Sequence, residues 1–336
     1  MAIFGISYRP VQSLKRISTG GFPPLSIFII REIYVHLNTT PRRSLRSGLL
    51  HFAQGLLMGG ADIIPGVSGG TVALVVGIYE RLVNAISSCF HAVLALLRFN
   101  MAEVRLHLAR VEWVFFLSLG SGIVSAILIG ASFIPHLLET YPLQSKGLFF
   151  GLIAASVAIP WSRMGRMNAS GYMLATSMAL AAFVLTGLAP AVVPEPTLLQ
   201  VFGAAMIAIC AMILPGISGA FLLLVLGMYE PTLKALHERE LLYVGVFIAG
   251  AATGLGLFSN LLKWLLERQH DRTMAALVGL MIGSLRALWP WQSAGTLHAP
   301  APTDPIGLIL LLATAGFVAV SALTWWSHRL TQAGRV

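Results

Sequence analysis

The stretch GGADIIPGVSGGTVALVVGIYE occupies Gly59–Glu80, and a related stretch, ILPGISGAFLLLVLGMYE, occupies Ile213–Glu230. At an offset of 150 residues, the windows 63–86 and 213–236 are identical at 11 of 24 positions. Each window contains P-G-x-S-G and, further along, G-x-Y-E. Proline removes a backbone donor and glycine permits sharp bends, so each stretch predicts a helix break inside an apolar segment.

The composition indicates that these breaks belong to a membrane protein. Of the 336 residues, 57% are hydrophobic and 10% are charged, against roughly 25% charged in soluble domains. The mean hydropathy is +0.81. The net charge of +9 resides in short loops and the N-terminal tail, where it sets orientation. We therefore expect an all-α polytopic membrane protein embedded in the bilayer, with no nucleic-acid partner.

Six further segments have the length and composition of membrane spans. A transmembrane helix takes about 20 predominantly apolar residues. The expected spans are residues 111–133, 145–161, 171–189, 241–262, 273–289 and 306–326. Residues 48–80 and 200–230 are too long for one straight crossing, and each is interrupted at P-G-x-S-G. Because broken backbone is tolerated at membrane depth only inside protein or beside a polar cavity, we expect two re-entrant helical hairpins.

The order of these segments predicts two repeats, at 48–190 and 191–336, after a basic cytoplasmic or interfacial segment at 1–47. An amphipathic stretch at 81–98 follows the first hairpin, and we expect it to lie in the plane of the interface. Each repeat has a hairpin and three spans. Because three is odd, the second repeat is inverted relative to the first. Lysine and arginine gather in alternate loops, which predicts that both termini are cytoplasmic.

Inverted repeats with broken helices are typical of secondary transporters, whose site lies where the breaks meet. Serines stand at the N-cap position after each break, and free amides at a half-helix start attract phosphate. The alternative is that the glycines only permit tight packing. The candidate phosphate-binding residues are Ser68, Gly69, Gly70, Thr71, Ser218, Gly219, Ala220 and Arg286, and the helix-break residues are Pro65, Gly66, Pro215 and Gly216.

Three acidic residues are candidates for ion coupling. Asp62 lies in an apolar run three residues before Pro65, and an ionisable residue inside a membrane is functional by default. It could carry a proton, hold a cation, pair with a base, or accept a structural hydrogen bond from exposed amides. Glu80 and Glu230 end the two G-x-Y-E motifs, with an ordinary interfacial position as the alternative. For Arg286 the alternative to phosphate binding is a snorkelling anchor.

Several motifs of other protein classes are missing from the sequence. There is no G-x-x-x-x-G-K-[ST] loop for an ATP motor, no H-E-x-x-H and no cluster of histidine and cysteine at metal-ligand spacing. The nine histidines are scattered and form no evident catalytic triad. We therefore expect no cofactor, no metal site and no enzymatic activity.

The motif from Asp62 through P-G-V-S-G-G-T to Glu80 resembles the former domain-of-unknown-function family 368, the PopT-type polyprenyl-phosphate transporters. The second hairpin, at 215–230, fits the same pattern, and the resemblance covers about residues 45–330. It implies a bacterial inner-membrane translocase that returns undecaprenyl phosphate from the outer to the cytoplasmic leaflet for cell-wall synthesis. From the residues alone, a transporter of a soluble anion and a membrane enzyme acting on a lipid phosphate remain alternatives. The coupling ion, H⁺ or Na⁺, stays open.

Overall fold

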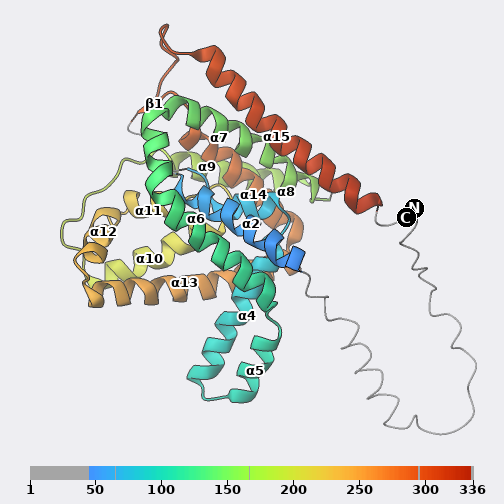
Figure 1. The fold of residues 1–336 in the computed structure, drawn as a ribbon, viewed down its shortest axis with the longest axis vertical. Helices are drawn as coiled ribbons and strands as arrows, with labels where there is room; N and C mark the ends of the chain where they lie inside the picture. The colour runs from blue at the N-terminus through green and yellow to red at the C-terminus, as the bar shows by residue number, and fades with distance from the viewer. Residues whose placement is uncertain (1–44, 65, 166, 294–295, 334–336) are drawn as a thin grey trace, which may run out of the picture. The chain divides into compact units, whose positions relative to one another are not determined.

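The computed structural model describes residues 45–333, apart from 65, 166, 294 and 295. The expected basic segment at 1–47 therefore lies almost entirely outside the described residues. The described chain is dominated by α-helices (Figure 1), which confirms the all-α prediction. A small antiparallel sheet pairs β1 (Gln292–Ser293) with β2 (Thr296–Leu297).

The helices of the first half of the chain follow one another with short connections. They are α2 (Leu45–Ile63), α3 (Gly69–Val75), α4 (Tyr79–Leu97), α5 (Met101–Ala109), α6 (Trp113–Thr140), α7 (Pro142–Ser156), α8 (Ala158–Ser162) and α9 (Ala169–Leu185). Both expected breaks are present as interruptions of helix, since α2 ends before the first P-G-x-S-G and α3 begins inside it.

The second half repeats this order without a counterpart of α5. Its helices are α10 (Leu198–Ile213), α11 (Gly219–Val225), α12 (Tyr229–His237), α13 (Leu241–Arg268), α14 (His270–Ser284), the 3₁₀ turn η1 (Leu285–Leu288) and α15 (Ile306–Ala333). Helix α10 ends and α11 begins around the second P-G-x-S-G, so the interruption recurs at the same place in the motif.

Five described helices are long and apolar enough to cross a membrane, and a sixth is counted if α11 and α12, which meet at 104°, form one bent span. The chain is thus a multi-pass membrane protein. Four of the five, at Trp113–Gly130, Pro142–Ser162, Leu241–Arg268 and Ile306–Trp325, coincide with expected spans. The fifth is α4, Tyr79–Leu97, where the sequence predicts an interfacial helix.

Two of the expected spans have shorter helices in the structure. Helix α9 overlaps the expected span 171–189 and has 17 residues, which places it among the shorter apolar helices. Helix α14 ends at Ser284, and the expected span 273–289 continues only as the 3₁₀ turn. Its first turn carries Asp271 and Arg272, which lower its mean hydropathy. The expected spans extend beyond these helices because α9 ends at its Thr186 cap and α14 passes into the 3₁₀ turn.

The most extensive helix contacts occur in matched pairs. Helix α2 packs on α6 and α10 on α13, while α7 packs on α15 and α9 on α14. Glycine allows the close approach in each pair: a Cβ on Gly55 of α2 would overlap the carbonyl oxygen of Leu119, and a Cβ on Gly250 of α13 would overlap that of Phe202. The last two pairs exchange partners between the halves of the chain, so neither half packs by itself.

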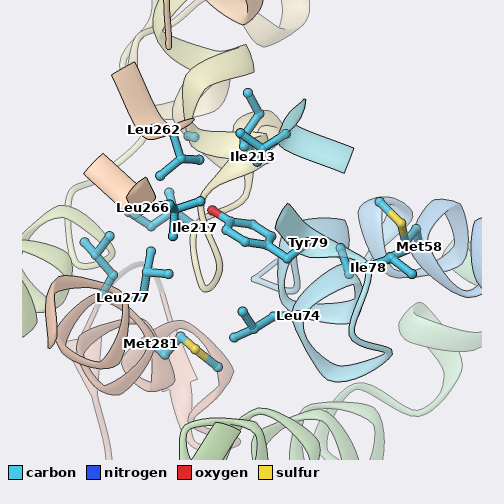
Figure 2. Close-up of a cluster of buried hydrophobic side chains, with 14 of the residues drawn as sticks. Met58, Leu74, Ile78, Tyr79, Ile213, Ile217, Leu262, Leu266, Leu277 and Met281 are labelled. Carbon is cyan, nitrogen blue, oxygen red and sulfur yellow. The ribbon is translucent and has the colours of Figure 1, made fainter. Parts of the chain in front are cut away.

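The main core lies where the two interrupted helices meet α13 and α14 (Figure 2). Tyr79, at the start of α4, is 1% exposed and sits among Leu74, Ile213, Ile217 and Leu266. This core fixes the breaks relative to each other, and it places the start of α4 beside the α10–α11 junction.

Candidate functional site: the paired helix breaks

The backbone of the two breaks has the same unusual conformation. Gly66 and Gly216 have φ values of 85° and 92°, a left-handed region that glycine adopts without steric cost. Gly77 and Gly227, which open the two G-x-Y-E motifs, have φ values of 77° and 71°. The sequence repeat therefore corresponds to a repeated backbone path, which these glycines make accessible. Pro65 lies outside the described residues.

Both serines cap the helix that follows, as their position predicts. Ser68 has extended dihedrals, and its Oγ accepts a 3.1 Å hydrogen bond from the Gly70 amide. Ser218 is likewise extended, and its Oγ accepts a 3.4 Å bond from the Phe221 amide. A serine N-cap stabilises a helix by about 1 kcal/mol, so each cap helps to define where the short helix begins.

The two breaks contact each other through buried hydroxyl groups. Ser68 Oγ lies 3.1 Å from the Leu214 carbonyl oxygen and 3.3 Å from that of Met212, between which its single proton is shared. Thr71 Oγ1 accepts a 2.9 Å bond from the Gly216 amide. Ser68 and Thr71 are each 1% exposed. Residues 144 to 146 positions apart in the sequence thus form one buried joint.

Asp62 lies in the last turn of α2, and its carboxylate contacts the start of α3. The Gly69 amide donates a 2.7 Å bond to Asp62 Oδ1, and the Gly70 amide is taken by Ser68. These two amides are therefore not free donors in this conformation. The sequence leaves several roles open for Asp62. The bond from the Gly69 amide corresponds to one of them, the structural hydrogen bond from an amide exposed at the break. A carboxylate suits this place because the first amides of a helix carry partial positive charge.

The second break has no such carboxylate. The counterpart of Asp62 is Met212, whose side chain packs against Gly219, so that a Cβ there would overlap the methionine. The start of α11 therefore lies beside the uncharged side chain of Met212, whereas the start of α3 lies beside the carboxylate of Asp62. Phe221 takes the place of Thr71, so the hydroxyl half of the joint comes from the first break alone.

The other predicted residues lie at separate places. Glu80 is 3.8 Å from Arg163, at the first G-x-Y-E turn. Glu230 lines a cavity of ≈ 390 Å³ at the second, together with Lys234. Arg286 Nη1 donates a 2.9 Å bond to the carbonyl oxygen of Phe183 on α9, and the guanidinium of Arg286 lies 4.4 Å from the centre of the Phe183 ring. Of the predicted site residues, the fold thus brings together those of the buried joint. Phosphate binding by Arg286 stays a prediction.

Sequence reasoning missed the surroundings of Glu80. Together with Arg81, Arg110, Glu112 and Arg163 it lines a cavity of ≈ 440 Å³. Arg81 forms a two-point ion pair with Glu112, and this hydrogen bond to Arg81 is the main cause that holds the pKa of the Glu112 carboxyl below its ordinary value. The arginines come from three separate loops and helices, so no local pattern in the sequence announces the cluster.

Tyr79 is the second feature that the sequence interpretation missed. Its hydroxyl is buried, and within the described part of the chain it has no hydrogen-bond partner. In Figure 2 the oxygen points toward Ile217 and Leu266. The equivalent Tyr229 is 37% exposed and lines the cavity at the second turn. The two equivalent tyrosines thus lie in different surroundings, one in the core and one at a cavity.

The fold and the site define a polytopic helical membrane protein with paired discontinuous helices. The chain belongs to the VCA0040-like, undecaprenyl phosphate translocase-like family, whose model matches residues 58–305. A protein of Vibrio cholerae named polyprenyl-phosphate transporter is 40% identical over 259 residues, covering 77% of this chain and 83% of the relative. One of Staphylococcus aureus with the same name is 28% identical over 267 residues, covering 72% of this chain and 86% of the relative.

These names indicate a transporter rather than an enzyme. No solved structure matches the chain. Among the residues that the structure describes, no group of three or more histidine, cysteine, aspartate or glutamate side chains could hold a metal ion.

Proposed function

We propose that this protein is a translocase of the bacterial inner membrane that moves undecaprenyl phosphate from the outer to the cytoplasmic leaflet for reuse in cell-envelope synthesis. Membership of the translocase-like family supports the substrate class. The observation that carries the mechanism is the buried joint between the two helix breaks, formed by Ser68 and Thr71. Both termini lie in the cytoplasm in this proposal, as the distribution of positive charge predicts.

The transporter consists of two inverted repeats, 48–190 and 191–336, each a re-entrant hairpin with three spans. Three observations support this arrangement. The positive-φ glycines recur at the same offset as the sequence repeat. The contact between α2 and α6 has its counterpart between α10 and α13. The contact between α7 and α15 has its counterpart between α14 and α9, as a two-fold relation requires. Rocking of such repeats would expose the joint to either leaflet in turn.

The phosphate group binds at the half-helix starts once the joint opens. Gly69 and Gly70 on one side, and Gly219 and Ala220 on the other, supply amides that suit an anion. The polyprenyl tail stays in lipid through a lateral opening. In the described conformation the Asp62 carboxylate holds the Gly69 amide, so the phosphate must displace it.

This competition gives Asp62 its role in coupling. Two anions cannot share one set of amides without strong repulsion, because like charges at short range disfavour the ionised form. Asp62 therefore takes up H⁺ or binds Na⁺ when phosphate enters, and releases the ion when the phosphate leaves. Glu80 and Glu230 lie at the two mouths of the path, where they exchange the ion with water on either side.

The test is leaflet exchange of undecaprenyl phosphate in liposomes, followed with a membrane-impermeant phosphatase. Wild-type protein is compared with Ser68→Ala and Asp62→Asn, under imposed pH and Na⁺ gradients. Ser177→Ala is the matched control, since its hydroxyl bonds only to the Leu174 carbonyl of its own helix. We expect exchange in wild type and in the control, with loss in both site variants. Wild-type exchange no faster than in protein-free liposomes refutes the proposal, and uptake of a soluble anion would then replace it.

A further inference from the structure

We propose that the cavity beside the first G-x-Y-E turn is a second anion site, separate from the buried joint, which binds a phosphate monoester. The joint itself is closed and buried, whereas this cavity has a volume of ≈ 440 Å³ and charged walls. Its role as the place where the lipid headgroup arrives after translocation rests on the proposed function. Its affinity for phosphate can be tested without transport.

The walls come from three parts of the chain that meet at the start of α4. Helix α4 contributes Glu80, Arg81 and Asn84, the α5–α6 connection contributes Arg110 and Glu112, and the residue after α8 is Arg163. In the proposed orientation all three parts lie at the cytoplasmic end of the path. Elements that move against each other during transport would therefore change the shape of this cavity.

One of the three arginines is fixed as part of the wall. Arg81 is held at two points by Glu112, lies 4.0 Å above the Phe115 ring and contacts His51 Nε2 at 3.3 Å. Glu112 neutralises this guanidinium, and the low pKa of its carboxyl keeps it ionised at neutral pH. The pair thus leaves the binding of an anion to the other two arginines.

Arg110 and Arg163 are available for that role. Arg163 is 3.8 Å from Glu80, which is long for an ion pair, and their side chains are 33% and 51% exposed. Within the ranges of chain that the structure describes, Arg110 forms no ion pair. An exposed ion pair of this kind contributes little to stability, so an arriving anion can displace Glu80 from Arg163 at little cost.

The chemistry of these groups suits a phosphate. A guanidinium presents its N–H donors in a planar fork that matches two phosphate oxygens, and the two forks together match a dianion. The cavity carries three arginines and two glutamates, an excess of one positive charge before the anion enters. Asn84 adds an uncharged amide donor to the same wall.

The equivalent cavity at the second G-x-Y-E turn lacks this character. Its lining includes Glu230 and one cation, Lys234, and its remaining wall comes mostly from the apolar stretch 190–194, with Leu224, Gly227, Tyr229 and Pro231. The arginine cluster therefore belongs to one side of the repeat pair only. A site that attracts phosphate on one side favours arrival of the headgroup there, which fits a carrier working toward the cytoplasm.

The experiment measures binding of inorganic phosphate and of undecaprenyl phosphate to the full chain in detergent by isothermal titration calorimetry. Charge-assisted hydrogen bonds contribute about 1.5–3 kcal/mol, so we expect Arg110→Gln and Arg163→Gln each to weaken binding by roughly tenfold or more. Glu80→Gln should strengthen it, because a competing carboxylate is removed. Arg98→Gln, at the far end of α4, is the matched control, and melting temperatures establish that each variant is folded.

Binding that changes less than about twofold in the Arg110→Gln, Arg163→Gln double variant overturns the site. Arg110→Lys should restore part of the affinity, which a merely structural role would not predict. If both probes bind, the site recognises the phosphate group itself; if only the lipid binds, the headgroup requires its tail. Leaflet exchange is measured separately: wild type that binds phosphate without exchanging lipid refutes the proposed function and leaves the site standing.

Discussion

The joint between the two breaks makes a sharp prediction at Gly70. A Cβ at this position would lie 2.5 Å from the carbonyl oxygen of Ile213, 3.0 Å from its carbon and 3.1 Å from the Met212 oxygen. All three are backbone atoms, so no side chain can rotate away. Gly70→Ala must therefore push α3 from the end of α10, and overpacking of this kind costs about 1–3 kcal/mol.

The same displacement breaks the hydrogen bonds across the joint. The bond from Ser68 to Leu214 is partly buried and the bond from the Gly216 amide to Thr71 is buried, and each contributes about 1 kcal/mol net. When the loss of these two bonds is added to the cost of overpacking, we expect Gly70→Ala to destabilise the joint by about 3–5 kcal/mol. The matched control is Gly60→Ala on α2, since a Cβ on Gly60 meets nothing within 4 Å.

The assay is thermal unfolding of both variants in one detergent, followed by leaflet exchange in liposomes. Gly60→Ala should melt at or above the wild-type temperature, because alanine favours a helix interior by up to about 1 kcal/mol. Gly70→Ala should melt clearly lower and lose exchange. Equal melting temperatures for the two variants would refute the reasoning, because the backbone contact at Gly70 would then not exist.

Three other residues give independent predictions. Tyr79→Phe removes a buried hydroxyl without a partner in the described structure, so we expect a higher melting temperature, by about 1 kcal/mol in free energy; a lower one would show that the hydroxyl is bonded. Asp62→Asn keeps an acceptor for the Gly69 amide but removes the charge, so the protein should fold while leaflet exchange under imposed pH and Na⁺ gradients is lost; exchange that still responds to the gradients would exclude Asp62 from coupling. The pKa of the Glu112 carboxyl is lowered from 4.5 by its bond to Arg81, so its stabilising effect is complete above pH 4.5 and is lost as pH falls through the lower folded value. Melting curves between pH 7 and pH 3 should show this loss in wild type and not in Glu112→Gln; identical acid dependence would contradict it.

The sequence was sufficient to locate the helix interruptions and their caps. Proline, glycine and serine act through the local backbone, and their effects at Gly66, Ser68, Gly216 and Ser218 depend on few distant residues. The apolar runs likewise predicted four of the helices that are long enough to span. Local chemistry, repeated at a fixed offset, was enough for this part of the fold.

Contacts between distant segments could not be predicted in the same way. The bond of Asp62 to Gly69 uses amides that the motif alone leaves open, and only the folded turn shows that they are taken. The arginines around Glu80 are separated by up to 82 positions, from Arg81 to Arg163, and in the sequence Arg110 and Arg163 are indistinguishable from ordinary loop charges. The burial of Tyr79 depends on α13 and α14, which no pattern near residue 79 reveals.

The unequal chemistry of the two breaks has an energetic consequence. If the repeats are related as proposed, two identical halves would make the inward-facing and outward-facing states equal in free energy, and the empty protein would divide itself evenly between them. Thr71 against Phe221, and Asp62 against Met212, remove that equality. Each 1.4 kcal/mol of difference shifts the ratio of the two populations about tenfold. In the proposed arrangement the side chains at this joint therefore contribute to the resting orientation of the carrier, and exchanging them between the halves would shift the populations toward the other state.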